Sequence, residues 1–280
     1  MYPFLKGHGT ENDFVVLLDP DGTVHGDLAP ERVRALCDRR AGIGADGVLR
    51  VIKTIAYAPE QAGEAEWFMD YRNADGSVSE MCGNGVRVFA QFLLASGLVT
   101  GDGEIPVATR DGLKIVYAAG DGLLQVDMGA PKLLGTTEVG LGDHRWTARH
   151  VDMGNPHAVA FVDDLDPRGS LGALLEAPWY DPALYPTGVN VEFVLARGER
   201  HLAMRVHERG SGETRSCGTG ACAAMVAAAD AAGQTPASVG GDLTYRVDVP
   251  GGVLAVTWTV DDRVLLTGPA VLVAEGETDL

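Results

Sequence analysis

The chain has 280 residues, of which 46% are hydrophobic and 22% charged, so it has ample material for one large globular domain or two ordinary ones. A formal net charge of −17 argues against binding to nucleic acid or to an anionic membrane surface, since both need clustered Lys and Arg. There is no signal-peptide pattern, no apolar run long enough to span a bilayer, and only 4 cysteines; together these predict a soluble, cytoplasmic protein.

The first half of the chain is predicted to be mainly strands, interrupted by two helices. Val33, Leu36 and Cys37 recur at helical spacing and predict a helix over residues 30–40. A second helix is expected over residues 86–94. Short apolar runs bounded by Gly or Asp-Gly turns predict strands over residues 14–18, 47–52, 67–72, 105–109, 113–117 and 123–128.

The second half of the chain repeats this plan. A helix is expected over residues 221–228, and a loop with a short helical segment around Pro178. Strands are predicted over residues 158–162, 188–194, 202–207, 243–249, 253–260 and 264–266.

The repetition extends to a short motif. Cys-Gly-x-Gly occurs at Cys82 and at Cys217, and each copy follows a polar, glycine-containing turn and opens a predicted helix. Corresponding positions lie at similar offsets: Cys217 is 135 residues after Cys82, Asn155 is 143 after Asn12, and Asn190 is 146 after Gly44. A repeat this long indicates two pseudo-symmetric domains produced by internal duplication.

These patterns predict an α+β fold in which each domain is a mainly antiparallel sheet wrapped around one central helix. The expected domains are residues 1–128, completed by a C-terminal strand within 264–280, and residues 129–263. The active site is expected in the cleft between them.

The duplicated cysteine is the strongest chemical signal in the sequence. A cysteine at a helix start lies at the positive end of the helix dipole, which favours the thiolate, and the free N–H groups there suit a carboxylate. Neither Cys82 nor Cys217 has further ligands at metal-site spacing, so no metal is expected. A lone nucleophile would leave the second cysteine unexplained, and a disulfide stays possible. Stereoinversion at carbon needs what the pair offers, a base on one face and an acid on the other.

Several motifs distributed from Lys6 to about Pro269 resemble those of the diaminopimelate epimerase family. They begin at Asn12, Gly42, Asn73, Met81, Gly154, Gly188, Glu208 and Cys217. The resemblance implies two mirrored halves, Cys82 and Cys217 as the acid/base pair, and L,L- and meso-diaminopimelate as substrates, in lysine and peptidoglycan precursor synthesis. It further implies that no cofactor is used and that the protein is a homodimer.

The resemblance also assigns supporting roles. His157 and Glu208 are expected to orient or polarise the two thiols, and Arg209 to bind the distal carboxylate in a bidentate manner. The residues expected to contact the substrate are Asn12, Asn73, Gly83, Asn84, Asn155, Asn190, Glu208, Arg209, Gly218 and Thr219. Three positions depart from the family pattern: Gly47 stands where many relatives have Gln, Glu11 where Gly is common, and Val88 where a Cys often follows the first helix start.

Two other functions compete with this interpretation. One is racemisation of proline or hydroxyproline on the same fold, which also uses two cysteines. The other is a non-catalytic module that binds anions at the two glycine turns. The binding module predicts that Cys→Ser changes leave function intact, whereas the epimerase predicts that they abolish inversion.

Overall fold

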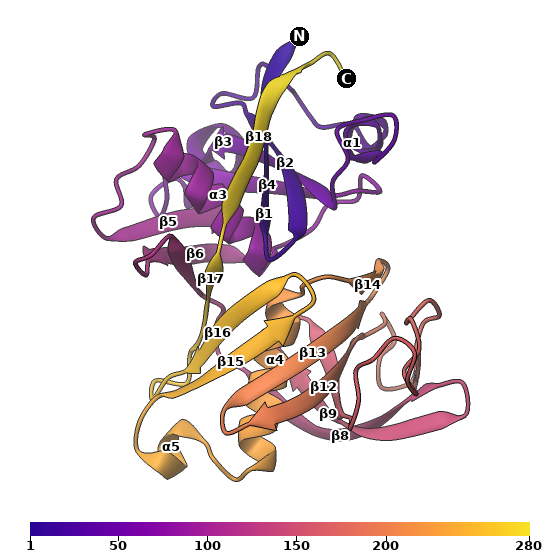
Figure 1. Cartoon of the computed structure of the whole chain (residues 1–280). Coiled ribbons are helices and arrows are strands. Elements are labelled where there is room, and N and C mark those ends of the chain that lie inside the picture. The colour runs from indigo at the N-terminus through magenta and orange to yellow at the C-terminus, as the bar shows by residue number, and fades with distance from the viewer. The chain divides into compact units, whose positions relative to one another are not determined.

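The computed structural model describes residues 1–280, which divide into two compact units (Figure 1). The first unit comprises Met1–Val126 together with Gly268–Leu280, and the second comprises Asp127–Thr267. The chain thus leaves the first unit, builds the second without interruption, and returns to the first. No helix in either unit is long and apolar enough to cross a membrane.

The first unit is one mixed sheet with a helix against it. Along the chain its elements are β1 (Tyr2–Gly9), β2 (Asn12–Leu18), α1 (Pro30–Cys37), β3 (Gly47–Lys53), α2 (Thr54–Tyr57), η1 (Pro59–Gln61), β4 (Trp67–Asn73), α3 (Gly83–Ala95), β5 (Glu104–Thr109), β6 (Gly112–Ala118), β7 (Leu123–Asp127) and β18 (Val271–Thr278). The spatial order of the strands is β18-β1-β2-β3-β4-β5-β6-β7. The pairs β2–β3 and β4–β5 are parallel and the others antiparallel.

The second unit is built in the same way. Its elements are β8 (Lys132–Leu141), β9 (His144–Asp152), β10 (Pro156–Phe161), β11 (Trp179–Tyr180), β12 (Asn190–Gly198), β13 (His201–Glu208), β14 (Gly212–Thr214), α4 (Gly218–Ala231), α5 (Pro236–Val239), β15 (Leu243–Val249), β16 (Gly252–Trp258) and β17 (Val264–Pro269). The main strands follow the order β8-β9-β10-β12-β13-β15-β16-β17. Here β10–β12 and β13–β15 are the parallel pairs.

The two strand orders match pair for pair, so the duplication read from the sequence is present in the topology. The parallel registers fix the equivalent residues. Phe14 pairs with Gly47 in the first unit and His157 with Asn190 in the second, so both pairs are related by the same offset of 143. The counterpart of Asn190 is therefore Gly47, and the offset of 146 drawn from Gly44 was wrong.

A central helix packs against each sheet (Figure 1). Helix α3 contacts β1 to β6 and β18, and α4 contacts β9, β10, β12, β13, β15 and β16 of its own unit. Both helices are buried over most of their length, α4 mainly through alanines that allow the strands to approach closely. The expected α+β fold, a sheet around a helix in each half, is confirmed.

The outer face of each sheet is covered differently. In the first unit α1 packs Val33 and Leu36 against β2 and β3. In the second unit, residues 162–189 bury Leu171, Leu174 and Tyr185 against β10 and β12. The short helical segment expected around Pro178 was wrong: the only regular element there is the two-residue strand β11. Four prolines in this stretch explain the result, since proline interrupts helices.

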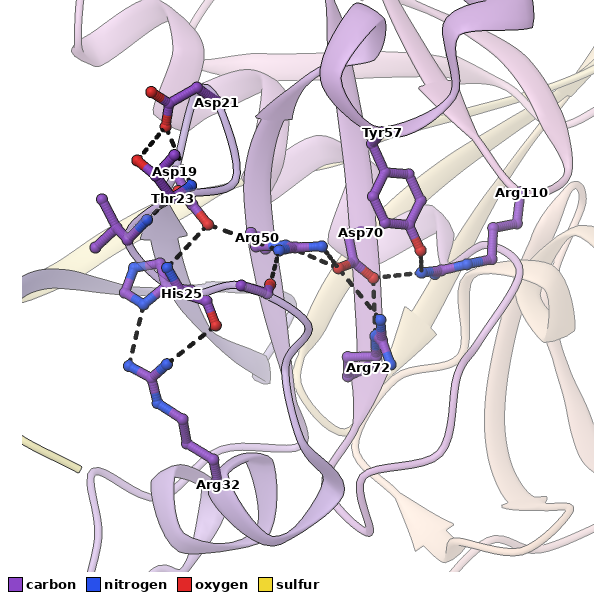
Figure 2. A network of polar contacts seen from close by, with 12 residues as sticks. Asp19, Asp21, Thr23, His25, Arg32, Arg50, Tyr57, Asp70, Arg72 and Arg110 are labelled. Carbon is purple, nitrogen blue, oxygen red and sulfur yellow. Dashed lines mark hydrogen bonds and ion pairs between the residues drawn. The ribbon is translucent and has the colours of Figure 1, made fainter.

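A buried ionic network lies on the outer side of the first sheet (Figure 2). Arg50 of β3 and Asp70 of β4 are cross-strand partners, and the Arg50 Nε donates to the Asp70 carboxylate at 2.9 Å. Arg72 donates to the other oxygen at 2.8 Å, and Arg110 contacts the same carboxylate. One carboxylate thus accepts hydrogen bonds from three guanidinium groups within the unit that carries Cys82.

Candidate functional site

Each central helix begins with a cysteine acting as its cap. Cys82 and Cys217 both have extended backbone, and each Sγ accepts a hydrogen bond at 3.4 Å from the amide three residues later, of Gly85 and Gly220. Oxygen side chains usually occupy this position. With sulfur there, the thiol lies among the unsatisfied N–H groups and the positive end of the helix dipole, where negative charge is stabilised.

In the first unit the cap is surrounded by asparagines. The Cys82 thiol donates to Asn12 Oδ1 at 3.6 Å, and Asn84 Nδ2 donates to the same oxygen at 3.2 Å. Asn12 is held from behind, because its Nδ2 donates to Asp46 Oδ2 at 2.8 Å. The structure therefore brings together three of the predicted site residues, Asn12, Cys82 and Asn84. It adds the Asp46 carboxylate, which holds Asn12 and was not assigned a role from the sequence.

The turn that carries Asn12 is fixed by ions. Arg39 donates to both oxygens of Asp13, at 3.0 and 2.7 Å, and Lys6 lies 2.9 Å from the same carboxylate. Burial acts to raise the pKa of Asp13, but the hydrogen bonds from Arg39 and Lys6 prevail and lower it to about 2. The carboxylate stays ionised, which keeps the Asn12 turn clamped.

The second unit brings together Asn155, Thr219 and Cys217 in the corresponding places. Asn155 Nδ2 donates to Thr219 Oγ1 at 3.4 Å, and Thr219 Oγ1 lies 3.5 Å from Cys217 Sγ. Asn155 is the counterpart of Asn12, and Thr219 that of Asn84. In both units an asparagine at the start of a strand is hydrogen-bonded to the residue two positions after the cysteine: Asn12 to Asn84, and Asn155 to Thr219.

Behind Cys217 the second unit is acidic and buried. Glu208, at the end of β13, accepts a hydrogen bond from the Thr214 hydroxyl, and burial raises its pKa. Burial also raises the pKa of the Cys217 thiol well above its ordinary value, and the nearby Glu208 carboxylate raises it further. In the unliganded protein Cys217 therefore holds its proton.

His157 lies fully buried next to this group. Its Nδ1 is 2.7 Å from Glu192 Oε1 and its Nε2 is 2.9 Å from Asn155 Oδ1. Glu192 is also fully buried, and sequence reasoning did not assign it a role. The available signal was a lone carboxylate within the apolar run of residues 188–194, which was interpreted only as a buried strand.

The remaining predicted residues lie near the turns that end strands. Arg209 places its guanidinium against Thr187, while its backbone N–H donates to Asn190 Oδ1 at 2.9 Å. Asn73, at the end of β4, donates to Ser77 Oγ at 3.0 Å. Gly83 and Gly218 are the first residues of their helices. The residues described contain no cluster of three or more His, Cys, Asp or Glu side chains that could hold a metal ion.

Solved structures of distant sequence show which fold the chain has. A PhzF-family phenazine biosynthesis protein from Bacillus anthracis matches with a TM-score of 0.70 at 17% identity, covering 100% of this chain and 99% of that one. A probable proline racemase from Agrobacterium radiobacter K84, solved with bound carbonate, matches with a TM-score of 0.64 at 16% identity, covering 100% and 93%. The chain has the fold common to these proteins.

Sequence comparison specifies the family within that fold. The family model described as diaminopimelate epimerase matches residues 4–134 and 149–273. The diaminopimelate epimerase of Streptomyces coelicolor is 60% identical, with 99% of this chain and 95% of the relative covered. That of Thermobifida fusca is 48% identical, with 99% and 98% covered. The chain belongs to the diaminopimelate epimerase family, and it is an isomerase.

Proposed function

We propose that this protein interconverts L,L-diaminopimelate and meso-diaminopimelate, as a step in lysine and peptidoglycan precursor synthesis, by a two-base mechanism without a cofactor. The observation that carries the proposal is the cysteine cap at the start of the central helix in both units. The names of relatives up to 60% identical support the choice of substrate over proline or hydroxyproline.

In the proposed reaction one thiolate removes the α-proton and the other thiol delivers a proton to the opposite face of the same carbon. The N–H groups at the helix starts stabilise the α-carboxylate and the charge that builds on it in the transition state. The raised pKa of Cys217 supports this residue as the proton donor in the unliganded protein. The two polar ends of the substrate are proposed to be bound by polar side chains of both units, namely Asn12, Asn73, Asn84, Asn155, Asn190, Thr219 and Arg209.

The test is α-proton exchange followed by NMR in deuterated water with reductant present. L,L-diaminopimelate and L-proline are offered in parallel to wild type, Cys82→Ser, Cys217→Ser and the control Cys222→Ala, which lies within α4 away from its start. We expect inversion of diaminopimelate alone, its loss in both serine variants, and its retention in the control. Exchange of proline would instead indicate the racemase, and no exchange with either substrate would favour a binding module.

We further propose that the protein acts as a cytoplasmic homodimer, in line with the family resemblance. Sedimentation velocity of the purified protein at micromolar concentration tests the oligomeric state. A single species at twice the chain mass of 29.4 kDa is expected, and a monomer would contradict the proposal.

A further inference from the structure

The duplication allows the buried pair His157–Glu192 to be compared with its own counterpart. With the offset of 143 fixed by the parallel registers, the first unit has Phe14 where the second has His157, and Leu49 where the second has Glu192. All four side chains are fully buried between sheet and helix. The fold therefore accepts an apolar pair here, and folding alone does not require two ionisable groups at these positions.

The second unit is also fitted around the Glu192 carboxyl. A Cβ at Gly220 would lie 2.7 Å from Glu192 Oε1, closer than atoms of this kind approach. In the first unit a Cβ at the equivalent Gly85 would meet Leu49 and Phe14 at ordinary distances of 3.4 and 3.6 Å. Gly220 thus leaves room for the carboxyl directly beneath the Cys217 cap.

The hydrogen bonds around His157 restrict where its protons lie. Glu192 Oε2 is buried and has no hydrogen-bond partner, which is costly for an ionised carboxylate and much less so for the carbonyl oxygen of a protonated one. A protonated Glu192 donates from Oε1 to His157 Nδ1, so the imidazole carries its own proton on Nε2. Burial raises the pKa of Glu192, although His157 opposes the shift, in agreement with this assignment.

With this tautomer, the hydrogen bonds that link His157 to the Cys217 sulfur all donate in the same direction, from His157 toward the sulfur. His157 Nε2–H donates to Asn155 Oδ1 at 2.9 Å, and this turns Asn155 Nδ2 toward Thr219 Oγ1 at 3.4 Å. Because the Thr219 oxygen accepts from Asn155, its hydroxyl proton is available to Cys217 Sγ, 3.5 Å away. If the His157 proton lay on Nδ1 instead, Nε2 would be an acceptor and the Asn155 amide would be reversed. Asn155 would then present its Oδ1 acceptor, and not its Nδ2 donor, to Thr219.

We propose that Glu192, in its protonated form, is a positioning residue that fixes the His157 tautomer and thereby directs the donors of Asn155 and Thr219 toward Cys217. This inference rests on the proposed function, because Cys217 is taken as one of the two bases. The other titratable groups that interact with Glu192 or His157 are Glu208, Tyr185 and His150, in addition to Cys217 itself.

The protonation states are tested first in the unliganded wild-type protein. The infrared difference spectrum between wild type and Glu192→Gln is expected to contain the C=O band of a buried protonated carboxyl, sensitive to deuteration. The same difference for the exposed Glu199→Gln should lack this band. Side-chain ¹H–¹⁵N NMR of His157, assigned with His157→Phe, should show a proton on Nε2 and a bare Nδ1. A bare Nε2, or a missing carboxyl band, would overturn the proposal.

The consequence for catalysis is tested by variants that differ in their ability to donate. Glu192→Gln keeps a donor for Nδ1, and we expect its kcat for diaminopimelate to fall by no more than about threefold. Glu192→Leu removes the donor and is expected to lower kcat on the order of tenfold to a hundredfold, with a smaller effect on KM. In Glu192→Leu the His157 Nδ1/Nε2 pattern should also change.

Folding is checked separately. The double variant His157→Phe with Glu192→Leu reproduces the apolar pair of the first unit and is expected to fold with little activity. A folded Glu192→Leu with wild-type kcat, or a Gln variant as impaired as the Leu variant, would contradict the proposal. If Glu192→Leu does not fold, the wild-type spectra decide. Wild type without epimerase activity would refute the proposed function, while the spectra would still decide the tautomer.

Discussion

At the scale of single residues, the two helix starts share their backbone and differ in what lies beneath it. Gly85 packs over the aliphatic Leu49 and the ring of Phe14, whereas Gly220 packs over the Glu192 carboxyl. The cysteine cap and its amide donor are common to both, so the thiols begin from the same geometry. Their electrostatic surroundings are set by these neighbours.

The two glycines are therefore expected to respond differently to substitution. Gly220→Ala should destabilise the protein by about 1 to 3 kcal/mol, since the new methyl group displaces Glu192. Gly85→Ala should change stability by within about 1 kcal/mol, because its Cβ has room and alanine favours a helix. Urea unfolding of the two variants measures the difference. Equal losses of unfolding free energy in the two variants would show that the Glu192 side chain moves aside at little cost.

The reactivity of Cys217 should report its acidic surroundings. Because the pKa of its thiol is raised, we expect iodoacetamide alkylation of Cys217 to be slow at pH 8 and still rising at pH 9. Glu208→Gln removes a negative neighbour and should speed alkylation several-fold at pH 8, while the exposed Glu199→Gln should not. Peptide mass spectrometry separates the sites. Cys37, whose pKa burial raises to about 12, gives the internal reference. An unchanged rate in Glu208→Gln would contradict the expectation.

Sequence reasoning at this scale identified the groups that repeat and overlooked one that does not. Cys82 and Cys217 were found because each copy supports the other, whereas Asn12 and Asn155 were assigned as site residues from the family resemblance. Glu192 has Leu49 as its counterpart, so the duplication gave no signal for it. Whether a carboxylate within a strand is exposed or buried depends on which face it occupies, and that required the register.

At the scale of elements, β3 and β4 are joined by charge as well as by backbone pairing. Arg50 is fully buried, and its partners Asp19 and Asp70 are fully buried with it (Figure 2). Hydrogen bonds also tie Arg110, which follows β5, to Asp70 and to the Tyr57 hydroxyl of α2. One aspartate therefore links three strands and a short helix.

Removing that aspartate's charge should be costly. Asp70→Asn removes the carboxylate shared by Arg50, Arg72 and Arg110, although Asp19 remains 3.6 Å from Arg50. The change should lower the free energy of unfolding by about 3 to 5 kcal/mol. Urea unfolding measures the loss, and the exposed Asp261→Asn serves as the control. A loss no larger than that of the control would mean that solvent or Asp19 replaces the missing charge.

The network should also make stability depend on acid. Burial acts to raise the pKa of Asp70, but hydrogen bonds from Arg72 and Arg110 and the charge of Arg50 prevail and lower it. A lowered pKa gives stability that is present above the unfolded value of about 3.9 and is lost as the pH falls through and below it. Wild type should lose stability over this range more steeply than Asp70→Asn. Parallel acid profiles of the two proteins would contradict this.

Helices and strands were predicted best where buried apolar residues recur at a regular spacing along the sequence. Helices α3 and α4 were found within a few residues of their ends, and most central strands were placed. Strand β8 was not recognised as such, since most of its side chains are exposed and no alternating pattern marks it. Strand β18, also largely exposed, was expected only as a strand somewhere within residues 264–280. Backbone pairing with a neighbour forms these strands, and a single sequence does not record that pairing.

At the scale of the whole molecule, the two units differ in continuity. The second unit is one uninterrupted segment, while the first depends on Gly268–Leu280 for the strand β18 that pairs along β1. Truncation after Pro269 should therefore weaken the first unit and leave the second intact. Hydrogen exchange followed by mass spectrometry should show lost protection in β1 and β2 and retained protection in β12 and β13. Equal loss in both units would contradict the separation.

The returning strand also bears on synthesis. A ribosome makes the first unit's helix and most of its sheet early, but β1 gains its outer neighbour only after residue 271 has been added. The second unit is complete before that point. During translation the later half of the chain can thus finish folding first, while the earlier half waits with an open sheet edge that chaperones or neighbouring chains can contact.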